Sequence, residues 1–143
     1  MAHLAHWLFK SEPSTWSWDQ TVAAGQDGTP WSGVRNHTAK LNMMAMRVGD
    51  TGFFYHSGAG REIVGIVEVA KAFHPDPSDA TGKFGMVSIR ALRPLKTFIT
   101  LAAVKAEPRL AKMSLVTSFR LSVQPVTAAE WKLICAMGGV AES

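Results

Sequence analysis

The sequence has only one cysteine, Cys135, among its 143 residues. A lone cysteine excludes an internal disulfide and a cysteine-based zinc site, and it is typical of a protein from a reducing compartment. No apolar run approaches the roughly 18 residues that a membrane-spanning helix needs, and residues 1–10 lack the apolar centre of a signal peptide. We therefore expect a cytoplasmic protein with no membrane partner.

Motifs that carry enzyme chemistry are also missing. The sequence has no Ser-His-Asp spacing, no paired carboxylates, no Walker loop and no dinucleotide-binding glycine pattern. His3 and His6 are three residues apart and His74 lies in a proline-rich stretch, but no cluster of carboxylates or cysteines completes a set of metal ligands. Cys135 fits a small buried side chain better than a nucleophile. The expectation is a protein that is not an enzyme and that holds neither a cofactor nor a metal.

Charge is sparse and weakly positive. Lys and Arg number 15 against 11 Asp and Glu, which gives a net charge of +4 and a pI of about 9.5. This balance favours polyanionic partners without requiring them. The basic residues are spread from Lys10 to Lys132, so any phosphate-binding surface has to be assembled by the fold. With 47% apolar residues, the chain suits one domain over residues 1–143.

Short apolar runs alternate with turn residues along the whole chain. This pattern predicts strands over residues 6–10, 51–57, 62–70, 84–92 and 120–124. Gly58-Ala59-Gly60 is expected to join the second and third strands as a hairpin, and Pro94 to end the fourth. The stretch from His74 to Asp79 is expected to be a polar loop. About five strands with surrounding short helices indicate an α/β (α+β) fold, with a small, mostly antiparallel sheet or open barrel.

Helix starts are marked by capping residues. Ser17 and Gln20 have the spacing of a capping box before a helix over residues 18–24, and Thr100 can cap a helix over residues 101–106. Asn36 is placed to cap a helix that carries Leu41, Met44 and Met46. The last helix has the clearest signals. Thr127 and Glu130 form a second capping box at its start, and Trp131, Ile134 and Cys135 share one apolar face.

Five tryptophans are many for a chain of this size. The pattern assigns Trp131 and Trp7 to the core, and Trp16 and Trp18 to packing around a helix start. Trp31 differs because it follows a proline in a glycine-bounded loop without apolar periodicity. It is either a stacking platform for a ligand or a side chain buried beneath the loop.

The segment Tyr55-His56-Ser57 ends a strand at a glycine turn. Its side chains can donate and accept hydrogen bonds at the rim of a sheet, as the wall of a binding pocket does. Ordinary turn chemistry explains the same residues, and the sequence leaves the two interpretations open.

Six segments together resemble the EVE domain family, which includes the thymocyte nuclear protein group. They are Trp7-Leu8-Phe9-Lys10-Ser11-Glu12-Pro13, Trp31-Ser32-Gly33-Val34-Arg35-Asn36, Val48-Gly49-Asp50, Phe54-Tyr55-His56-Ser57, Val64-Gly65-Ile66-Val67-Glu68-Val69 and Arg120-Leu121-Ser122-Val123-Gln124-Pro125-Val126. The resemblance covers nearly the whole chain. It implies a PUA-like open β-barrel related to the YTH domains, which read N6-methyladenine in RNA. Family members are associated with recognising modified bases, including modified cytosines in DNA, and bacterial-type members often accompany restriction or defence systems.

The resemblance also assigns roles to positions around a proposed base pocket. The positions that match the family's pocket segments are Lys10, Ser11, Glu12, Trp31, Val34, Arg35, Asn36, Tyr55, His56, Ser57, Ser122 and Gln124. Arg35 and Lys40 are candidates for phosphate contacts. The sequence departs from many relatives at His37, where tyrosine is common, and by a short loop between Asp76 and Phe84 that can line the approach of a polynucleotide.

These features together predict a reader module that holds a modified cytosine or adenine of DNA or RNA in an aromatic pocket. An aromatic face contributes roughly 1 to 3 kcal/mol of stacking per base, and hydrogen bonds to the base edge select which base it is. Two alternatives stay open. One is an RNA-binding PUA-like module for structured or methylated RNA, and the other is a small-molecule or nucleotide-processing enzyme that uses His56 as a base.

Overall fold

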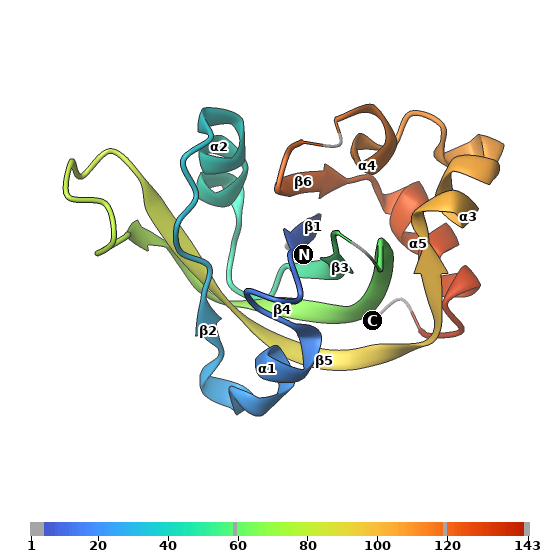
Figure 1. The fold of residues 1–143 in the computed structure, drawn as a ribbon, viewed down its shortest axis with the longest axis horizontal. Helices are drawn as coiled ribbons and strands as arrows, with labels where there is room; N and C mark the ends of the chain where they lie inside the picture. The colour runs from blue at the N-terminus through green and yellow to red at the C-terminus, as the bar shows by residue number, and fades with distance from the viewer. Residues whose placement is uncertain (1–4, 59, 119, 142–143) are drawn as a thin grey trace.

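A computed structural model of the protein describes residues 5–58, 60–118 and 120–141. Along the chain it has β1 (His6–Ser11), α1 (Trp18–Ala23), a 3-10 turn η1 (Gly25–Asp27), β2 (Thr29–Pro30), α2 (His37–Ala45), β3 (Thr51–His56), β4 (Glu62–Pro75), β5 (Gly85–Thr100), α3 (Leu101–Ala106), a second 3-10 turn η2 (Pro108–Leu110), α4 (Ser114–Thr117), β6 (Val123–Val126) and α5 (Ala128–Met137). The six strands form one sheet in the order β2-β5-β4-β3-β1-β6 (Figure 1). Its neighbouring strands are antiparallel except for the parallel pair β1 and β3.

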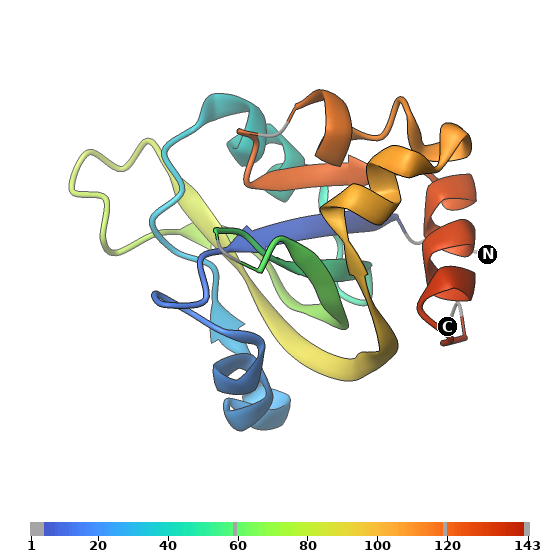
Figure 2. The same ribbon diagram turned by 45° about the vertical axis from the view of Figure 1, so that its right-hand side comes forward.

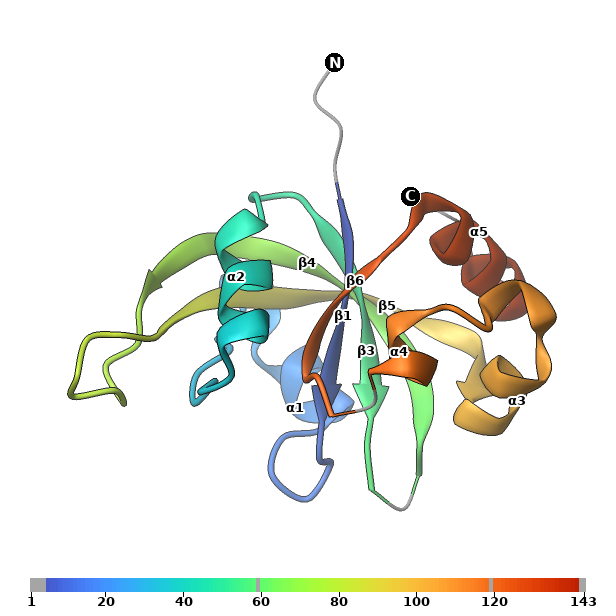
Figure 3. The ribbon, with the colours of Figure 1, turned by 90° about the horizontal axis from the view of Figure 1, so that it is seen from above.

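Both faces of the central strands are buried. Successive residues of β1 alternate between two cores, with Trp7 and Phe9 in one and Leu8 in the other. In β3, Phe53 and Phe54 divide between the cores in the same way. One core lies under α3, α4 and α5 and the other under α1 and α2, on opposite sides of the sheet (Figures 1 and 3). A strand buried on both faces reads as a continuous apolar run, which is how these two strands appear in the sequence.

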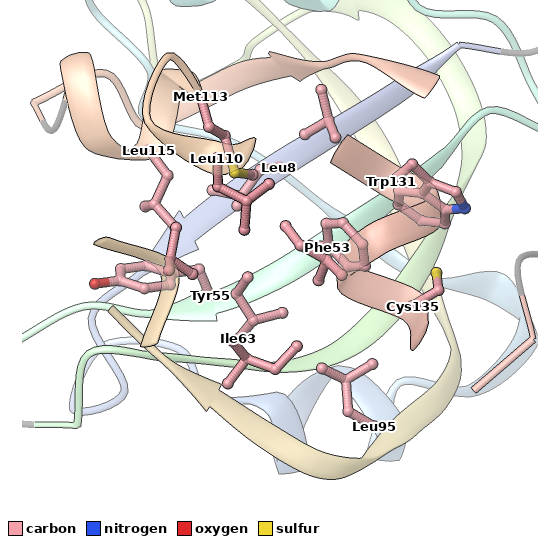
Figure 4. Close-up of a cluster of buried hydrophobic side chains, with 14 of the residues drawn as sticks. Leu8, Phe53, Tyr55, Ile63, Leu95, Leu110, Met113, Leu115, Trp131 and Cys135 are labelled. Carbon is pink, nitrogen blue, oxygen red and sulfur yellow. The ribbon is translucent and has the colours of Figure 1, made fainter. Parts of the chain in front are cut away.

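The core beneath α5 confirms the apolar face predicted for the last helix. Trp131, Ile134 and Cys135 are all buried, and the Trp131 ring stacks on Phe53 with a centroid separation of 4.1 Å. Figure 4 shows these two rings at one end of the cluster and Tyr55 at the other, with the tyrosine hydroxyl directed away from the apolar side chains. The cluster therefore ends at this hydroxyl.

The hairpin of β4 and β5 is longer than the sequence pattern predicted. His74 and Pro75, expected in a loop, pair with Met86 and Gly85, so that the hairpin projects beyond α2 (Figure 3). The expectation that Pro94 ends β5 was wrong, because β5 continues to Thr100 through an irregular segment. Between the pairs Gly65↔Pro94 and Ile63↔Ile99 the strand bulges, and the N–H groups of residues 96 and 97 donate to the carbonyl of Gly138. A bulge tolerates proline since its nitrogen needs no partner there.

The edges of the sheet were the least predictable strands. β6 occupies Val123–Val126 rather than residues 120–124, and it includes Pro125, which had been expected to follow the strand. Proline is accepted because β6 lies at the edge, beside β1 (Figure 2). β2 is only two residues long, pairs with β5 at the other edge and had no signal in the sequence. The sheet thus has one more strand than the five expected.

The predicted helix caps are confirmed. Ser17 and Thr127 each form a capping box, and the side chains of Asn36 and Thr100 accept from the backbone N–H three residues later. Among the described residues, no helix is both long and apolar enough to cross a membrane.

The outer face of α2 is exposed although it is apolar. Leu41 is 64% exposed and Met44 is 52% exposed, while Ala39 and Met43 face the core. Only some of the apolar side chains of α2 therefore pack against the core.

We expect Leu41→Gln to change the free energy of unfolding by no more than about 0.5 kcal/mol, because the side chain buries little surface on folding. Urea denaturation of the two proteins measures this difference. A loss of about 2 kcal/mol or more, which is typical of truncated core side chains, would mean that Leu41 packs against the protein.

Asp50 stabilises the turn that precedes β3. Its carboxylate is buried and accepts hydrogen bonds from the N–H groups of Ala5 and Arg47 and from the indole N–H of Trp7, each at 3.0 Å. A buried carboxylate needs such donors. Asp50 therefore ties the start of β1 to the turn before β3.

Candidate nucleic-acid interface

A cavity of about 560 Å³ lies where the end of β1 meets the loops that follow β1 and β2. This volume is within the range of small-molecule sites. Its lining residues are Lys10, Ser11, Glu12, Thr15, Trp16, Thr29, Pro30, Trp31, Ser32, Gly33, Val34, Arg35, Asn36 and Ser122. We call it the base cavity. It brings together eight of the predicted site positions, namely Lys10, Ser11, Glu12, Trp31, Val34, Arg35, Asn36 and Ser122.

Trp31 packs partly against the core and also lines the cavity, and its role as a stacking platform stays a prediction. Its ring is half-buried and meets Phe9 and Phe54 edge to face, at centroid separations of 5.3 and 5.9 Å. Its backbone N–H donates to the carbonyl of Val87 at 2.7 Å, which fixes the loop to β5. The indole thus rests on the core and also lines the cavity. A ring held in this way is a rigid surface for stacking.

Trp16 is a second tryptophan of the cavity wall, and it also packs against the core, as the sequence pattern predicted. Its indole N–H donates to the hydroxyl of Thr21 at 2.8 Å, and its backbone N–H donates to the carbonyl of Glu12 at 2.9 Å. The Ser11 hydroxyl donates to the carbonyl of Trp16. These bonds hold the indole in place. The sequence signal that could have placed Trp16 at the cavity is its closeness to Lys10, Ser11 and Glu12.

The loop over residues 33–36 is held by Asp76, a residue that the sequence placed only in a polar loop. The Asp76 carboxylate is buried and accepts from the N–H of Gly33 at 2.8 Å, from the N–H of Ser78 at 2.8 Å and from the Ser78 hydroxyl at 2.6 Å. An Arg35 nitrogen lies 3.5 Å away. The side chain of Val34, in the same loop, packs into the core. The loop is therefore anchored on both sides before any ligand arrives.

Hydrogen bonds keep Asp76 ionised. Burial by itself raises the pKa of this carboxyl, but the bonds from Ser78, Gly33 and Arg35 outweigh burial and bring the pKa below its usual value of 3.8. The carboxylate is consequently charged throughout the neutral range. Its negative charge offsets part of the positive charge of Arg35.

Arg35 extends from the cavity to a basic patch, which we define as Arg35, His37 and Lys40 around the ring of Phe84. The guanidinium of Arg35 lies 5.7 Å from the centroid of this ring, and the ammonium of Lys40 lies 5.6 Å from it. The His37 ring is 5.2 Å away. The short loop after Asp76 leads to Phe84, so this end of the loop lies beside Arg35, a residue of the cavity wall. Cations collected beside an open cavity suit the phosphates of a polynucleotide.

Polar groups line the rest of the base cavity. The Oδ1 atom of Asn36 accepts from the N–H of Ala39 at 2.9 Å as a helix cap, so the amide NH2 is the group that can donate to a ligand. The carbonyl of Ser122 accepts from the N–H of Lys10 at 2.8 Å, which joins the chain before β6 to the end of β1. Ser122 thereby reaches the cavity although it lies far from the other lining residues in the sequence.

Lys10 is half-buried at the end of β1. Burial lowers its pKa from 10.5 to about 8, because a desolvated ammonium is less stable than a solvated one. Its Nζ atom lies 5.9 Å from the ring centroid of Tyr55. A small rise in pH above neutral therefore changes the charge of the cavity wall.

The remaining predicted positions lie outside the base cavity. Tyr55 and Ser57 line a second cavity that also includes Lys10. The Nε2 atom of His56 accepts from the N–H of Trp18 at 3.0 Å, at the start of α1. Gln124 is buried and donates from Nε2 to the carbonyls of Ser114 and Ser118, at the two ends of α4.

His56 has a structural task, as its surroundings show. Burial lowers its pKa, against the smaller opposing effects of Glu62, Asp19 and Glu12. The neutral ring accepts a hydrogen bond at Nε2, so the lone pair that a general base needs is already engaged.

In the part of the chain that the structure describes, no three His, Cys, Asp or Glu side chains are grouped to hold a metal ion. His3 lies outside the described residues.

The fold is a PUA-like α+β fold, as predicted. The YTH domain of Zygosaccharomyces rouxii MRB1, solved in complex with N6-methyladenosine RNA, superposes with a TM-score of 0.56 at 14% identity, over 100% of this chain and 89% of that one. At this identity the likeness concerns the fold alone. The chain belongs to the EVE domain family, whose sequence pattern it matches over residues 5–137.

Individual relatives agree with this assignment. The Rhodopseudomonas palustris protein Rpa0253 has 65% identity and a TM-score of 0.91, over 95% of this chain and 94% of that one. Human thymocyte nuclear protein 1 is 32% identical over 93% of this chain and 73% of its own length. Human THYN1, solved in complex with DNA that contains 5-methylcytosine, has 31% identity and a TM-score of 0.87, over 96% of this chain and 99% of that one.

Proposed function

We propose that the protein is a reader of nucleic acid that holds one modified base in the base cavity, between the surfaces of Trp31 and Trp16. The observation that carries this proposal is the cavity itself, which is lined by two indoles fixed in place and by polar groups. Support comes from human THYN1, the relative whose complex contains 5-methylcytosine DNA. The protein acts by binding, without chemical conversion of its ligand.

The parts of the cavity divide the work of recognition. Trp31 and Trp16 offer aromatic faces, each worth roughly 1 to 3 kcal/mol for a stacked base. Among the lining residues, Asn36 offers its amide NH2 as a donor, and Glu12 offers a carboxylate acceptor for an amino group such as that of cytosine or adenine. The basic patch receives the phosphates next to the extruded base.

DNA carrying 5-methylcytosine is the first candidate ligand. The relative in complex with it shares 31% identity over nearly the whole chain, whereas the likeness to the RNA-binding YTH domain is one of fold. Flipping a base out of a duplex costs a few kcal/mol, which phosphate contacts have to offset. Because a buried methyl group contributes only about 0.8 kcal/mol, we expect a preference of about fourfold for the methylated base over the plain one.

Fluorescence-detected binding to matched oligonucleotides tests this function. The panel consists of DNA and RNA, single-stranded and double-stranded, each with plain or methylated cytosine or adenine, at one fixed salt concentration. Tighter binding to one modified base supports the proposal and names the base. A preference for RNA in direct competition supports the alternative of a methylated-RNA reader. Equal, salt-sensitive binding to every member overturns base reading.

Oligonucleotide affinity should fall as the pH rises through about 8, where Lys10 loses its proton. The sign follows from the lowered pKa: the ammonium is charged below this pH and neutral above it, so its attraction to phosphate is present at pH 7 and lost at pH 9. Glu12 and Arg35 share the base cavity with Lys10, and Tyr55, Arg61 and Lys105 share the other cavity that Lys10 lines. We expect a loss of about tenfold, which corresponds to one charge-assisted contact of about 1.4 kcal/mol.

Titration of affinity against pH, at constant ionic strength, measures this loss. In Lys10→Gln the affinity should already be low at pH 7 and change little up to pH 9. Lys132→Gln, an exposed position on α5, is the control and should keep the wild-type pH profile. An unchanged slope in Lys10→Gln would show that another group is responsible.

A further inference from the structure

A second cavity of about 380 Å³ lies beside the base cavity. Its lining residues are Lys10, Tyr55, Ser57, Gly58, Arg61, Leu101, Lys105, Leu115 and Val116. They come from β1, β3, the β3–β4 turn, α3 and α4. We call it the second cavity. It belongs to the core side beneath α3 and α4, opposite the side on which Trp31 packs.

The charges of the second cavity have one sign. Three cations line it, Lys10, Arg61 and Lys105, and none of its lining residues is a carboxylate. The carboxylate of Glu12, a residue that lines the base cavity, lies close to Gly58 at the border of the second cavity. Three cations that line one partly enclosed space attract an anion more strongly than isolated surface lysines do.

Arg61 is held in position for this task by its backbone. Its φ angle of 43° is left-handed, which is uncommon for a residue other than glycine. Its carbonyl accepts from the N–H of Leu101 at 2.8 Å, and its Nε atom donates to the carbonyl of Gly58 at 3.2 Å. These contacts connect the β3–β4 turn to the start of α3, the helix that carries Lys105. Left-handed backbone held by neighbouring structure is frequent at binding sites.

Tyr55 supplies a neutral hydrogen-bond donor to the same space. Its ring is buried and its hydroxyl lies at the end of the apolar cluster, pointing outward (Figure 4). Burial raises the pKa of this hydroxyl, against the smaller opposing effect of Arg61, so that it keeps its proton at neutral pH. A protonated phenol donates to an anion rather than repelling it.

We propose that the second cavity binds a phosphate group through Arg61, Lys105 and Lys10, with the Tyr55 hydroxyl as a further donor. Lys10 lines both cavities, so the two cavities adjoin at this residue, and one strand can place a base in the first and a phosphate in the second. The phosphate of a nucleic acid strand whose base occupies the base cavity is the expected source, and this part rests on the proposed function. A free phosphate or a mononucleotide offers the same chemistry.

The test is an amide NMR titration of the isotopically labelled protein. Inorganic phosphate is added first, then a single-stranded oligonucleotide with one 5-methylcytosine, to wild type, to Arg61→Gln and to Lys105→Gln. Lys132→Gln is the control for removal of an exposed lysine. Backbone spectra of each variant also show that it is folded. We expect the amides of residues 58, 61, 105 and 116 to shift with a phosphate-bearing ligand in wild type and in the control.

Both single variants should weaken oligonucleotide binding about tenfold and lower the dependence of log affinity on log salt by about one contact. Shifts from the oligonucleotide that are lost in Arg61→Gln establish the strand as the source of the phosphate. Shifts from inorganic phosphate alone, with oligonucleotide binding unchanged in both variants, establish a site for free phosphate. No shift near the second cavity with either ligand overturns the site. If phosphate binds there but the oligonucleotide panel shows no preference for a modified base, base reading fails and the anion site stands.

Discussion

Replacing Trp31 by alanine is expected to weaken binding of the modified oligonucleotide by roughly 5- to 150-fold, the equivalent of 1 to 3 kcal/mol of stacking. The indole is the ring that lines the base cavity while resting on Phe9 and Phe54, so its removal takes away a stacking surface whose position is fixed without a ligand. Preference for the modified base should disappear together with affinity. Fluorescence anisotropy with labelled oligonucleotides measures both.

The structure also predicts a modest cost in stability for this variant. Trp31 is half-buried, so Trp31→Ala is expected to lose about 1 to 2 kcal/mol of folding free energy while remaining folded at 25 °C. Trp31→Phe is the matched control, because it keeps an aromatic face and should retain most of the affinity. Binding that survives unchanged in the folded alanine variant would exclude Trp31 as the platform.

Replacing Asp76 by alanine is the second large effect that we expect. The variant leaves the N–H of Gly33 without its acceptor and releases Arg35 and Ser78. Loss of hydrogen bonds to a buried charged group should destabilise the protein by about 3 kcal/mol. Loosening of the loop over residues 33–36 should weaken oligonucleotide binding about tenfold, because the cavity wall is then ordered only on binding.

The pH dependence of this variant has a definite sign. The pKa of Asp76 is lower in the folded protein than its ordinary 3.8, so the carboxylate stabilises the fold fully above that pH. The contribution is lost as the pH falls through the lower, folded value. Denaturation of wild type and Asp76→Ala should therefore give a difference in stability that is constant at neutral pH and shrinks below about pH 4.

Asp27→Ala removes a carboxylate from an exposed position and serves as the control, with little change in stability or binding. If Asp76→Ala behaved like this control, the hydrogen bonds of Asp76 would not hold the loop. If stability fell but affinity did not, the loop over residues 33–36 would play no part in the site.

Elements whose signals are local were predicted well from the sequence. The capping boxes at Ser17 and Thr127 and the buried face of α5 follow from spacing within one or two helical turns. Features decided by distant partners were missed. Proline normally ends a strand. After Pro94, however, β5 bulges, and the carbonyl of Gly138, at the end of α5, accepts hydrogen bonds from the N–H groups of residues 96 and 97. β2 exists only because β5 provides its partner.

The candidate site shows the same division. The segments from Lys10 to Glu12 and from Trp31 to Asn36 come together at one cavity, as the family resemblance implied. The Asp76 carboxylate, which holds the loop over residues 33–36, bonds to Gly33 more than 40 positions away in the sequence. The Asp-x-Ser spacing of Asp76 and Ser78 was its only sequence signal, and it indicates a local turn. His56 and Gln124 are polar positions whose hydrogen bonds go to backbone groups of α1 and α4. The sequence cannot distinguish a polar side chain that serves a ligand from one that caps a helix.

If a modified base enters the base cavity between Trp31 and Trp16, the indole N–H signals of these two tryptophans will report its entry. The five tryptophans give five such signals, which single phenylalanine variants assign. On titration with an oligonucleotide that contains 5-methylcytosine, the signals of Trp31 and Trp16 should shift strongly, and that of Trp131, in the opposite core, should stay in place. Oligonucleotide binding that leaves the Trp31 and Trp16 signals unmoved would contradict binding of the base between these two rings.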